Sequence, residues 1–418
     1  MKMITKEEFE EYCSKNNLKY KFKHKYDSEY DLKYNWNITN LFNVLCCYGY
    51  IETIKWLITL GEINIHANDE YTFRTSCRNG KLEIAKLLME ISKENNEIIN
   101  IHSENEEAFK LSCSRGHLEI AKWLIKISKE NGEMINIHAN NEEAFIWSCR
   151  NGHLEMAKWL MKISKENDKI INIHANNEEA FRWSCCYGYI EIVKWLIKIS
   201  KENGKIIDIN TNNEEVFKLS CGNGFINVVK WLMKIAEENG KMIDIHANDE
   251  EAFICSCHNG HIKVAKWLLT LGEINIHIKN EEAFISSCKF GEIKVAKWLI
   301  KISKKNGEII NIHAKNEKAF RKSFRYGFIE VTKWLIKISK ENGDTINIRA
   351  KNDEIFRFCY HSGKIETARL LCSLCDDYYI EIENNKIVKY RIKNMYDKYL
   401  DENKGIKKVI KKLQLKVI

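Results

Sequence analysis

Proline is absent from this chain of 418 residues. Because no helix can begin with proline at its first position, polar caps must set the helix starts. Long apolar runs are missing too, and no stretch approaches the about eighteen apolar residues that a membrane span needs. Residues 1–8 turn acidic before any apolar run, unlike a signal peptide. We therefore expect an intracellular protein that is not secreted and has no transmembrane segment.

A basic excess is absent from most of the chain, although the net charge is +8. Residues 386–418 hold eleven Lys/Arg and three Asp/Glu, so this segment carries the whole excess. The residues before it are neutral in sum, and their net charge gives no sign of nucleic-acid binding, although it leaves a local basic stripe possible.

The chain contains ten copies of one internal repeat. Ten phenylalanines follow one another at intervals of 36 residues, or 31 in two cases, and a glycine comes seven residues after each. Seven residues further on stands tryptophan in eight copies and leucine in two. Such a period indicates a solenoid of stacked units. The phenylalanines are Phe42, Phe73, Phe109, Phe145, Phe181, Phe217, Phe253, Phe284, Phe320 and Phe356.

One copy shows why the repeat should fold as two helices. Asn140 or Asn141 can cap a short first helix, and with Asn140 as the cap Glu143 completes a capping box. Gly152 suits the left-handed residue that ends this helix. Residues 154–164 then place apolar side chains on one face of a second helix, followed by an extended return. In the two short copies, the first and the seventh, the second helix should end about one and a half turns early.

The repeat resembles the ankyrin repeat over roughly residues 38–372. Phe145 falls on the Leu of the family's Thr-Pro-Leu-His motif, Ser148 and Cys149 on its Ala pair, and residues 152–155 on its Gly-His-x-Glu. Thr-Pro is replaced by Glu-Ala, the first-helix His is missing, and the loop before the first helix is about three residues shorter. The resemblance therefore implies a stunted hairpin finger. The elongated form with Cys and Trp is similar to ankyrin-repeat proteins encoded by giant DNA viruses (mimivirus-like).

We therefore predict an all-α, ankyrin-type helix-turn-helix repeat solenoid of about ten units, curved and elongated. Residues 1–37 should form an N-terminal cap or a degenerate repeat, and residues 38–385 the solenoid. Residues 386–418 should form a basic C-terminal capping or tail helix, because residues 405–418 place apolar side chains on one helical face.

Repeated Cys, His and Trp residues are interpreted as architecture. Eight of the 15 cysteines share one column and suit a small buried position, and Cys372-Ser-Leu-Cys375 is a weak zinc or redox signal without a second pair. One His per repeat structures the loop and supplies no ligand cluster, while Trp packs between adjacent second helices instead of stacking on bases. We expect no cofactor, no metal, no catalytic residue and no enzyme. The cysteine column is Cys46, Cys77, Cys113, Cys149, Cys185, Cys221, Cys257 and Cys288.

Partner contacts are expected where the repeats differ, at the two positions before each glycine. In the ankyrin family this pair faces the concave groove, and Arg and Tyr are common at interface hot spots. Ordinary variation of a solvated surface is the alternative. The candidate partner-binding residues are Arg78, Arg115, Arg150, Tyr187, His258 and Tyr326.

These features favour a monomeric protein-interaction scaffold that binds a host or viral protein through the concave face, in the host-cell cytoplasm. The alternative is a nucleic-acid or membrane-surface adaptor, which would contact nucleic acid or an anionic membrane only through residues 386–418.

Overall fold

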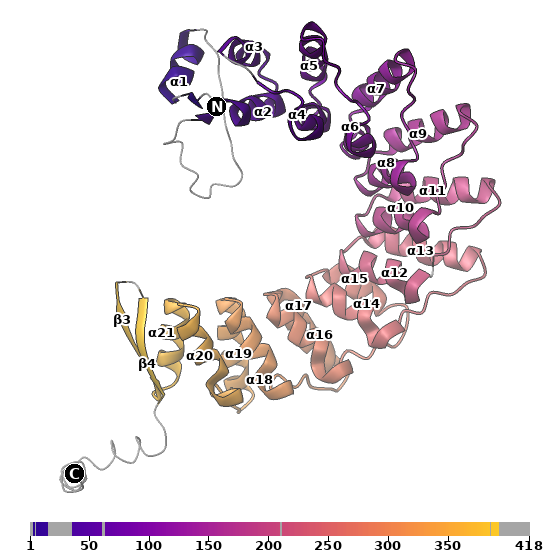
Figure 1. Cartoon of the computed structure of the whole chain (residues 1–418). Coiled ribbons are helices and arrows are strands. Elements are labelled where there is room, and N and C mark those ends of the chain that lie inside the picture. Colours follow the sequence, from indigo (N-terminus) through magenta and orange to yellow (C-terminus); the bar gives the residue numbers. More distant parts are fainter. Residues whose placement is uncertain are drawn as a thin grey trace, which may run out of the picture. The chain divides into compact units, whose positions relative to one another are not determined.

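The computed structural model describes residues 3–4, 6–15, 36–60, 63–209, 211–384 and 386–392. In these ranges α1 (Lys6–Lys15) is followed by ten helix pairs (Figure 1). The chain divides into a first unit, Met1–Asp208, and a second unit, Ile209–Ile418. The short strands β1 (Met3–Ile4) and β2 (Trp36–Asn37) pair in the first unit. Its helix pairs are α2 (Ile38–Tyr48) with α3 (Ile51–Leu60), α4 (Ala67–Arg78) with α5 (Leu82–Glu94), α6 (Ser103–Ser114) with α7 (Leu118–Glu130), α8 (Ala139–Arg150) with α9 (Leu154–Glu166), and α10 (Ala175–Cys186) with α11 (Ile190–Glu202).

The second unit repeats this plan and ends in a β-hairpin of β3 (Tyr378–Glu383) and β4 (Lys386–Ile392), with a bulge between Glu381 and Ile382. Its helix pairs are α12 (Thr211–Gly222) with α13 (Ile226–Glu238), α14 (Ala247–His258) with α15 (Ile262–Leu268), α16 (Ile278–Lys289) with α17 (Ile293–Lys305), α18 (Ala314–Arg325) with α19 (Ile329–Glu341), and α20 (Ala350–His361) with α21 (Ile365–Leu374). The predicted all-α repeat solenoid is confirmed. Among the described residues no helix combines the length and apolar character that crossing a bilayer requires.

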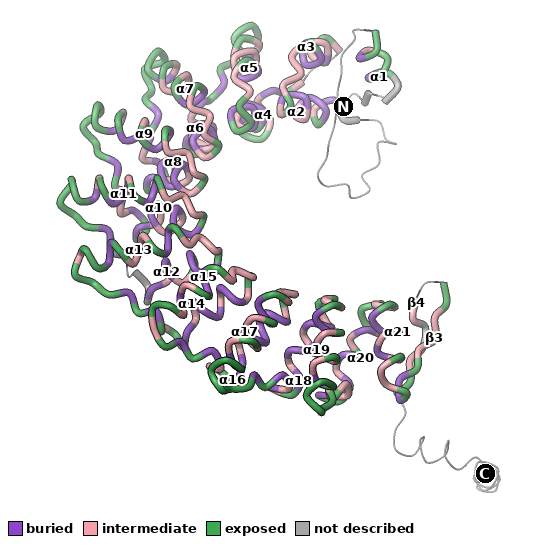
Figure 2. Tube along the Cα trace, turned by 180° about the vertical axis from the view of Figure 1, so that it is seen from behind, coloured by how far each residue is buried: buried purple, intermediate pink, exposed green. Residues whose placement is uncertain are grey.

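Stacking of first helices builds the core of each unit. In the first unit α4, α6, α8 and α10 pack in succession, and the second helices cover them. Buried residues lie where these helices meet, and exposed ones lie at the outer loops (Figure 2). The repeated phenylalanines are buried, and five of them contact the tryptophan of the following repeat, as Phe145 does with Trp195 at 6.1 Å between ring centroids. Tryptophan is therefore a packing residue, but its aromatic partner is the phenylalanine on the first helix of the preceding repeat.

The start of each first helix differs from the predicted capping box. The N-cap residue is His138, its side chain makes no cap hydrogen bond, and Asn140, Asn141 and Glu142 have left-handed backbone angles with φ between 54° and 70°. Left-handed residues other than glycine cost about 1–2 kcal/mol each. The buried Glu142 carboxylate offsets this cost, because it accepts a hydrogen bond from His138 Nδ1 at 2.9 Å and from the backbone N–H of Asn172 at 3.1 Å.

The histidine column therefore structures the loops, as predicted, and in six repeats the Glu accepts a hydrogen bond from the backbone of the next repeat. The same His–Glu contact recurs at His66, His102, His174, His246, His277 and His313.

The lengths of the second helices confirm the interpretation of the two short copies. The second helix has 10 residues in α3 and 7 in α15, against 13 in α5, α7, α9, α11, α13, α17 and α19. The second helix of the tenth copy, α21, has 10 residues as well.

Each end of the array supplies the contacts that a further repeat would make. At the N-terminal end, the Tyr12 ring of α1 stacks on Trp56 at 4.0 Å, and Phe9 lies 6.4 Å away from the same ring. At the C-terminal end, Tyr378 stacks on Phe356 at 4.0 Å and donates a hydrogen bond to Asp353 at 2.7 Å. Asp353 occupies the position of Glu142 in the last repeat.

The C-terminal segment differs from the prediction at its beginning. A helix over residues 386–418 is wrong for Lys386–Ile392, which form strand β4, because these residues pair antiparallel with β3. Residues 393–418, with the amphipathic stretch 405–418, lie outside the described residues, as do residues 16–35 of the predicted N-terminal cap.

Candidate partner-binding groove

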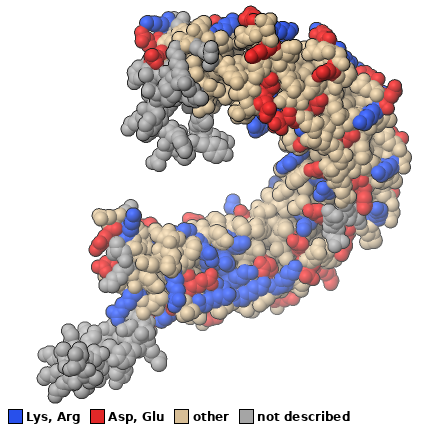
Figure 3. Space-filling view, in the orientation of Figure 1, with Lys and Arg blue, Asp and Glu red and all other residues tan. Residues whose placement is uncertain are grey.

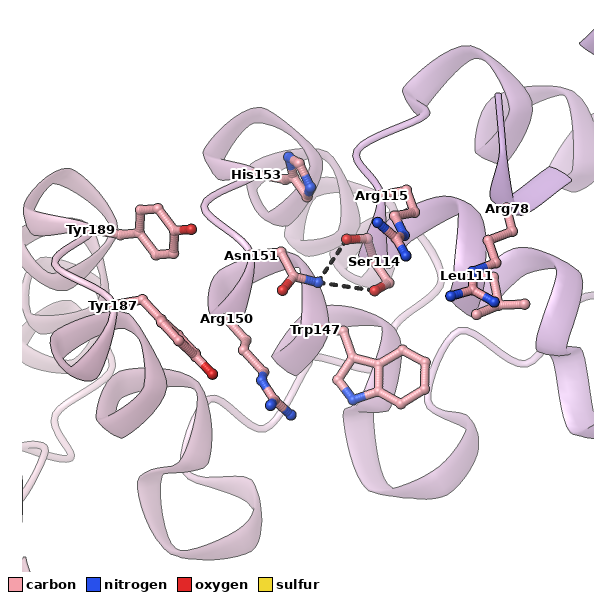
Figure 4. Close-up of a pocket in the computed structure, with 10 residues that line it drawn as sticks. All are labelled: Arg78, Leu111, Ser114, Arg115, Trp147, Arg150, Asn151, His153, Tyr187 and Tyr189. Atoms are coloured by element: carbon pink, nitrogen blue, oxygen red, sulfur yellow. Dashed lines mark hydrogen bonds between the residues drawn. The ribbon is translucent and has the colours of Figure 1, made fainter. Parts of the chain in front are cut away.

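A groove of about 630 Å³ opens across the C-terminal ends of first helices α4, α6, α8 and α10 (Figure 4). Four of the six residues predicted from the sequence come together there, and the structure places all four in the first unit. The lining residues are Arg78, Leu111, Ser114, Arg115, Trp147, Arg150, Asn151, His153, Tyr187 and Tyr189.

Helical spacing explains why these side chains share one face. Trp147 lies two residues after Phe145, and Arg150 and Asn151 lie five and six residues after it. Positions three or four residues apart on a helix are neighbours, so Trp147 shares a face with both of them. Sequence reasoning missed this column, although its variation between Leu111 and Trp147 in consecutive repeats is the same signal that identified the arginines.

The three arginines give the groove a positive charge. Arg78 and Arg115 are exposed and Arg150 is half-buried. Among the described residues none of the three forms an ion pair. By contrast, cations nearer the start of the same helices are paired across repeats, as Lys110 is with Glu143 at 2.9 Å. The groove therefore holds cations that remain available to a ligand.

Aromatic rings position one of these cations. The Arg150 guanidinium carbon lies 4.3 Å from the ring centroid of Trp183 and 5.9 Å from that of Tyr187. Trp183 and Tyr187 stack on each other at 5.6 Å, and Trp183 Nε1 donates a hydrogen bond to Glu179 at 3.0 Å. A guanidinium held against aromatic faces loses less side-chain entropy when it binds a carboxylate.

Polar contacts between repeats fix the floor of the groove. Asn151 donates hydrogen bonds to the backbone oxygen of Ser114 at 2.7 Å and to its Oγ at 2.9 Å. The His153 ring lies against Gly116, where an added Cβ would come within 2.5 Å of Nδ1. Burial lowers the pKa of His153, against the opposing effect of a hydrogen bond with the Ser114 backbone, so this ring is uncharged near neutral pH. Contacts between repeats therefore hold the floor of the groove in place. The positive charge of the groove comes from the arginines.

The other two predicted residues, His258 and Tyr326, belong to the second unit and do not line this groove. They lie at the equivalent ends of α14 and α18. Phe290 of α16 connects them, since its ring centroid is 3.6 Å from that of His258 and 6.3 Å from that of Tyr326.

The described part of the chain gives little support for a nucleophilic cysteine or a metal site. The cysteine column is buried, and burial raises the pKa of thiols such as Cys113 and Cys149 well above the ordinary value. A protonated, enclosed thiol is a packing group and a poor nucleophile. No three His, Cys, Asp or Glu side chains among the described residues gather into a set that could hold a metal ion.

Comparison with known proteins gives one family. A model described as "Ankyrin repeats (3 copies)" matches residues 41–133, 113–213 and 217–313. No curated protein matches the chain. Ankyrin repeats are generally protein–protein interaction modules. With five helix pairs in each unit and a family match over more than half of its length, the chain belongs to the ankyrin-repeat family.

Proposed function

We propose that the chain is a protein-interaction scaffold whose groove in the first unit binds an acidic segment of a host or viral protein inside the cell. The observation that carries this proposal is the set of three arginines without ion-pair partners among the described residues, placed in one groove beside Trp147 and Tyr187. Carboxylates would form charge-assisted hydrogen bonds with these guanidinium groups, and such bonds are stronger than those between neutral groups.

The spacing of the repeats favours a particular conformation of the bound segment. Packed helices lie about 8–10 Å apart, so one arginine per repeat offers a positive charge at about that interval. A polyproline II helix rises about 9.3 Å every three residues and returns to the same face. An acidic residue at every third position would therefore meet successive arginines, while prolines between them would lie on Trp147 and Tyr187.

Charge reversal tests the proposal. We expect the Arg78→Glu, Arg115→Glu, Arg150→Glu protein to bind a peptide of Glu-Pro-Pro repeats about 100-fold more weakly, because each lost pair contributes roughly 1 kcal/mol. The measurement is isothermal titration calorimetry. A matched control reverses three exposed lysines near the ends of second helices in the same unit, Lys129, Lys165 and Lys201.

Two results would contradict the proposal. One is equal binding by the arginine and lysine variants. The other is a parent protein that binds neither the peptide nor any acidic protein captured from extracts of the relevant cell. Peptides with Glu at every second or fourth position test the spacing separately, and we expect them to bind more weakly than the three-residue period.

The alternative of a nucleic-acid or anionic-membrane adaptor acting through the basic tail stays a prediction, because residues 393–418 lie outside the described residues. Salt-dependent binding that disappears when the tail is deleted would support it. The monomeric state is a prediction as well, and light scattering would test it.

A further inference from the structure

A second cationic surface lies on the first helices of the second unit. Helix α18, with the sequence AKNEKAFRKSFR, carries five basic residues against one acid, and that acid, Glu317, is buried in the contact with His313. Lysine and arginine side chains gather over α16, α18 and α20 (Figure 3). The neutral sum of the repeats therefore hides a local concentration of positive charge.

Two half-buried acids beside α18 do not neutralise this charge. Glu282 of α16 already contacts two lysines, Lys315 at 2.5 Å and Lys318 at 3.3 Å. Glu354 of α20 likewise contacts two arginines of α18, Arg321 and Arg325. Among the described residues Lys289 and Lys322 form no ion pair, so positive charge remains available on this surface.

Aromatic rings alternate with these cations along three successive first helices. The Phe290 and Tyr326 rings are nearly parallel, at 16°, and 36% and 51% exposed. Lys289 Nζ lies 4.6 Å from the Phe290 ring centroid and 5.8 Å from that of Tyr326.

Further rings lie on both sides of the Phe290–Tyr326 pair. His258 continues it on α14, and since burial lowers the pKa of His258, with a further contribution from Lys289, this ring is neutral near pH 7. On α20, Phe358 lies under Arg325, whose guanidinium carbon is 4.6 Å from the ring centroid.

We infer that this cation–aromatic strip binds single-stranded nucleic acid. Lysine and arginine would contact the phosphates, and the exposed Phe290 and Tyr326 rings, with the half-buried Phe358 at one end, would stack on unpaired bases, which accept any aromatic face regardless of sequence. An acidic protein segment without proline or aromatic residues would use the cations but leave the ring faces without a matching group. Duplex DNA keeps its bases stacked on one another and out of reach of the rings. The strip consists of His258, Lys289, Phe290, Lys322, Arg325, Tyr326 and Phe358.

Replacing the rings separates stacking from charge. The full-length protein is titrated into a fluorescein-labelled 15-nucleotide oligo(dT) or oligo(U), with polyglutamate and a 15-base-pair duplex as competitors, and anisotropy is recorded. We expect Phe290→Leu and Phe358→Leu each to weaken single-strand binding about tenfold, as the loss of one stacked base does. The matched control, Tyr71→Leu, removes a ring that is 44% exposed in the first unit and should leave the affinity unchanged.

Replacing the cations tests the phosphate contacts. For single strands the logarithm of the affinity falls with the logarithm of the salt concentration by about 0.7 per phosphate contact. The Lys289→Gln, Lys322→Gln protein should therefore show a slope about 1.4 shallower than the parent. The control, Lys301→Gln, Lys305→Gln, loses the same charge from exposed positions of α17 and should keep the parent slope.

The inference is overturned by several results. These are a parent protein that does not bind the oligonucleotides, a duplex or polyglutamate that binds as tightly as the single strand, or ring variants with parental affinity. The basic tail is unchanged in every variant, so binding that depends on the tail alone would also leave all variants equal to the parent. Circular dichroism of each variant confirms that the repeats remain folded.

Discussion

The buried carboxylate that joins one repeat to the next provides the most direct test of how the array is stabilised. In the Glu142→Ala protein, His138 and the backbone N–H of Asn172 lose their acceptor in a partly buried site. Hydrogen bonds to charged groups contribute about 1.5–3 kcal/mol each, and relief of the buried charge returns part of this. We expect a net loss of about 3 kcal/mol. Glu142→Gln keeps one acceptor oxygen and should cost about 1–2 kcal/mol.

Native-state hydrogen exchange is the appropriate measurement, because an array of repeats need not unfold in one step and a single denaturation curve can hide a local change. We expect exchange to accelerate first at the amide of Asn172 and then through α10. The control is Glu155→Ala, which removes an exposed carboxylate 2.8 Å from Lys158 and should cost about 0.5 kcal/mol. If the Glu142 and Glu155 variants agree within about 0.5 kcal/mol, the carboxylate does not join the repeats as we describe.

Other predictions concern the turns, the histidines and the thiols. Gly116→Ala should destabilise the protein by about 1–3 kcal/mol more than Gly132→Ala in urea denaturation, because both glycines have positive φ but an added Cβ meets a neighbour only at Gly116. Equal effects would contradict the close approach of His153. Because burial lowers the pKa of His153 below its unfolded value, the folded state loses stability as the pH falls below about 6.5, and His153→Tyr should lose less between pH 7 and pH 5 in thermal melts. A steeper loss in the variant would reverse the sign of this argument. At pH 8, iodoacetamide should modify the partly exposed Cys47 and leave the buried Cys149 unmodified, as measured by mass spectrometry. Equal modification rates would show that the cysteine column opens readily.

The fold can be predicted well from the sequence because the residues that recur in every repeat are those that pack in the core. The recurrence of Phe145 and Cys149 at a fixed interval marks buried positions, and the short spacing after Phe253 predicts the early end of α15. The variation of the two positions before each glycine also marks Arg150 as a residue that the core does not fix. These features depend on local spacing, which a single chain displays ten times.

Features that depend on geometry between repeats are not predictable in the same way. The spacing of Asn140 and Glu143 matches a standard capping box, but the bonds that Glu142 accepts from His138 and from the backbone of the next repeat offset the cost of three left-handed residues. Grouping of the partner-binding candidates also depends on the division of the chain into units. It separates Tyr326 from Arg150, and no single-repeat pattern reports it.

The hairpin at the end of the second unit has a consequence for how arrays of this kind can be lengthened or shortened. In six repeats a glutamate, and in five a phenylalanine, contacts the repeat that follows. In α20 the equivalent Asp353 and Phe356 both contact one side chain of β3, Tyr378. Asp377 adds a contact with Arg349 at 2.8 Å. The hairpin therefore acts as a C-terminal capping element for the repeats. Placed after an earlier repeat, the hairpin should stabilise a shorter array. Simple truncation would instead leave the last carboxylate without a hydrogen-bond donor and the last phenylalanine ring without a packing partner.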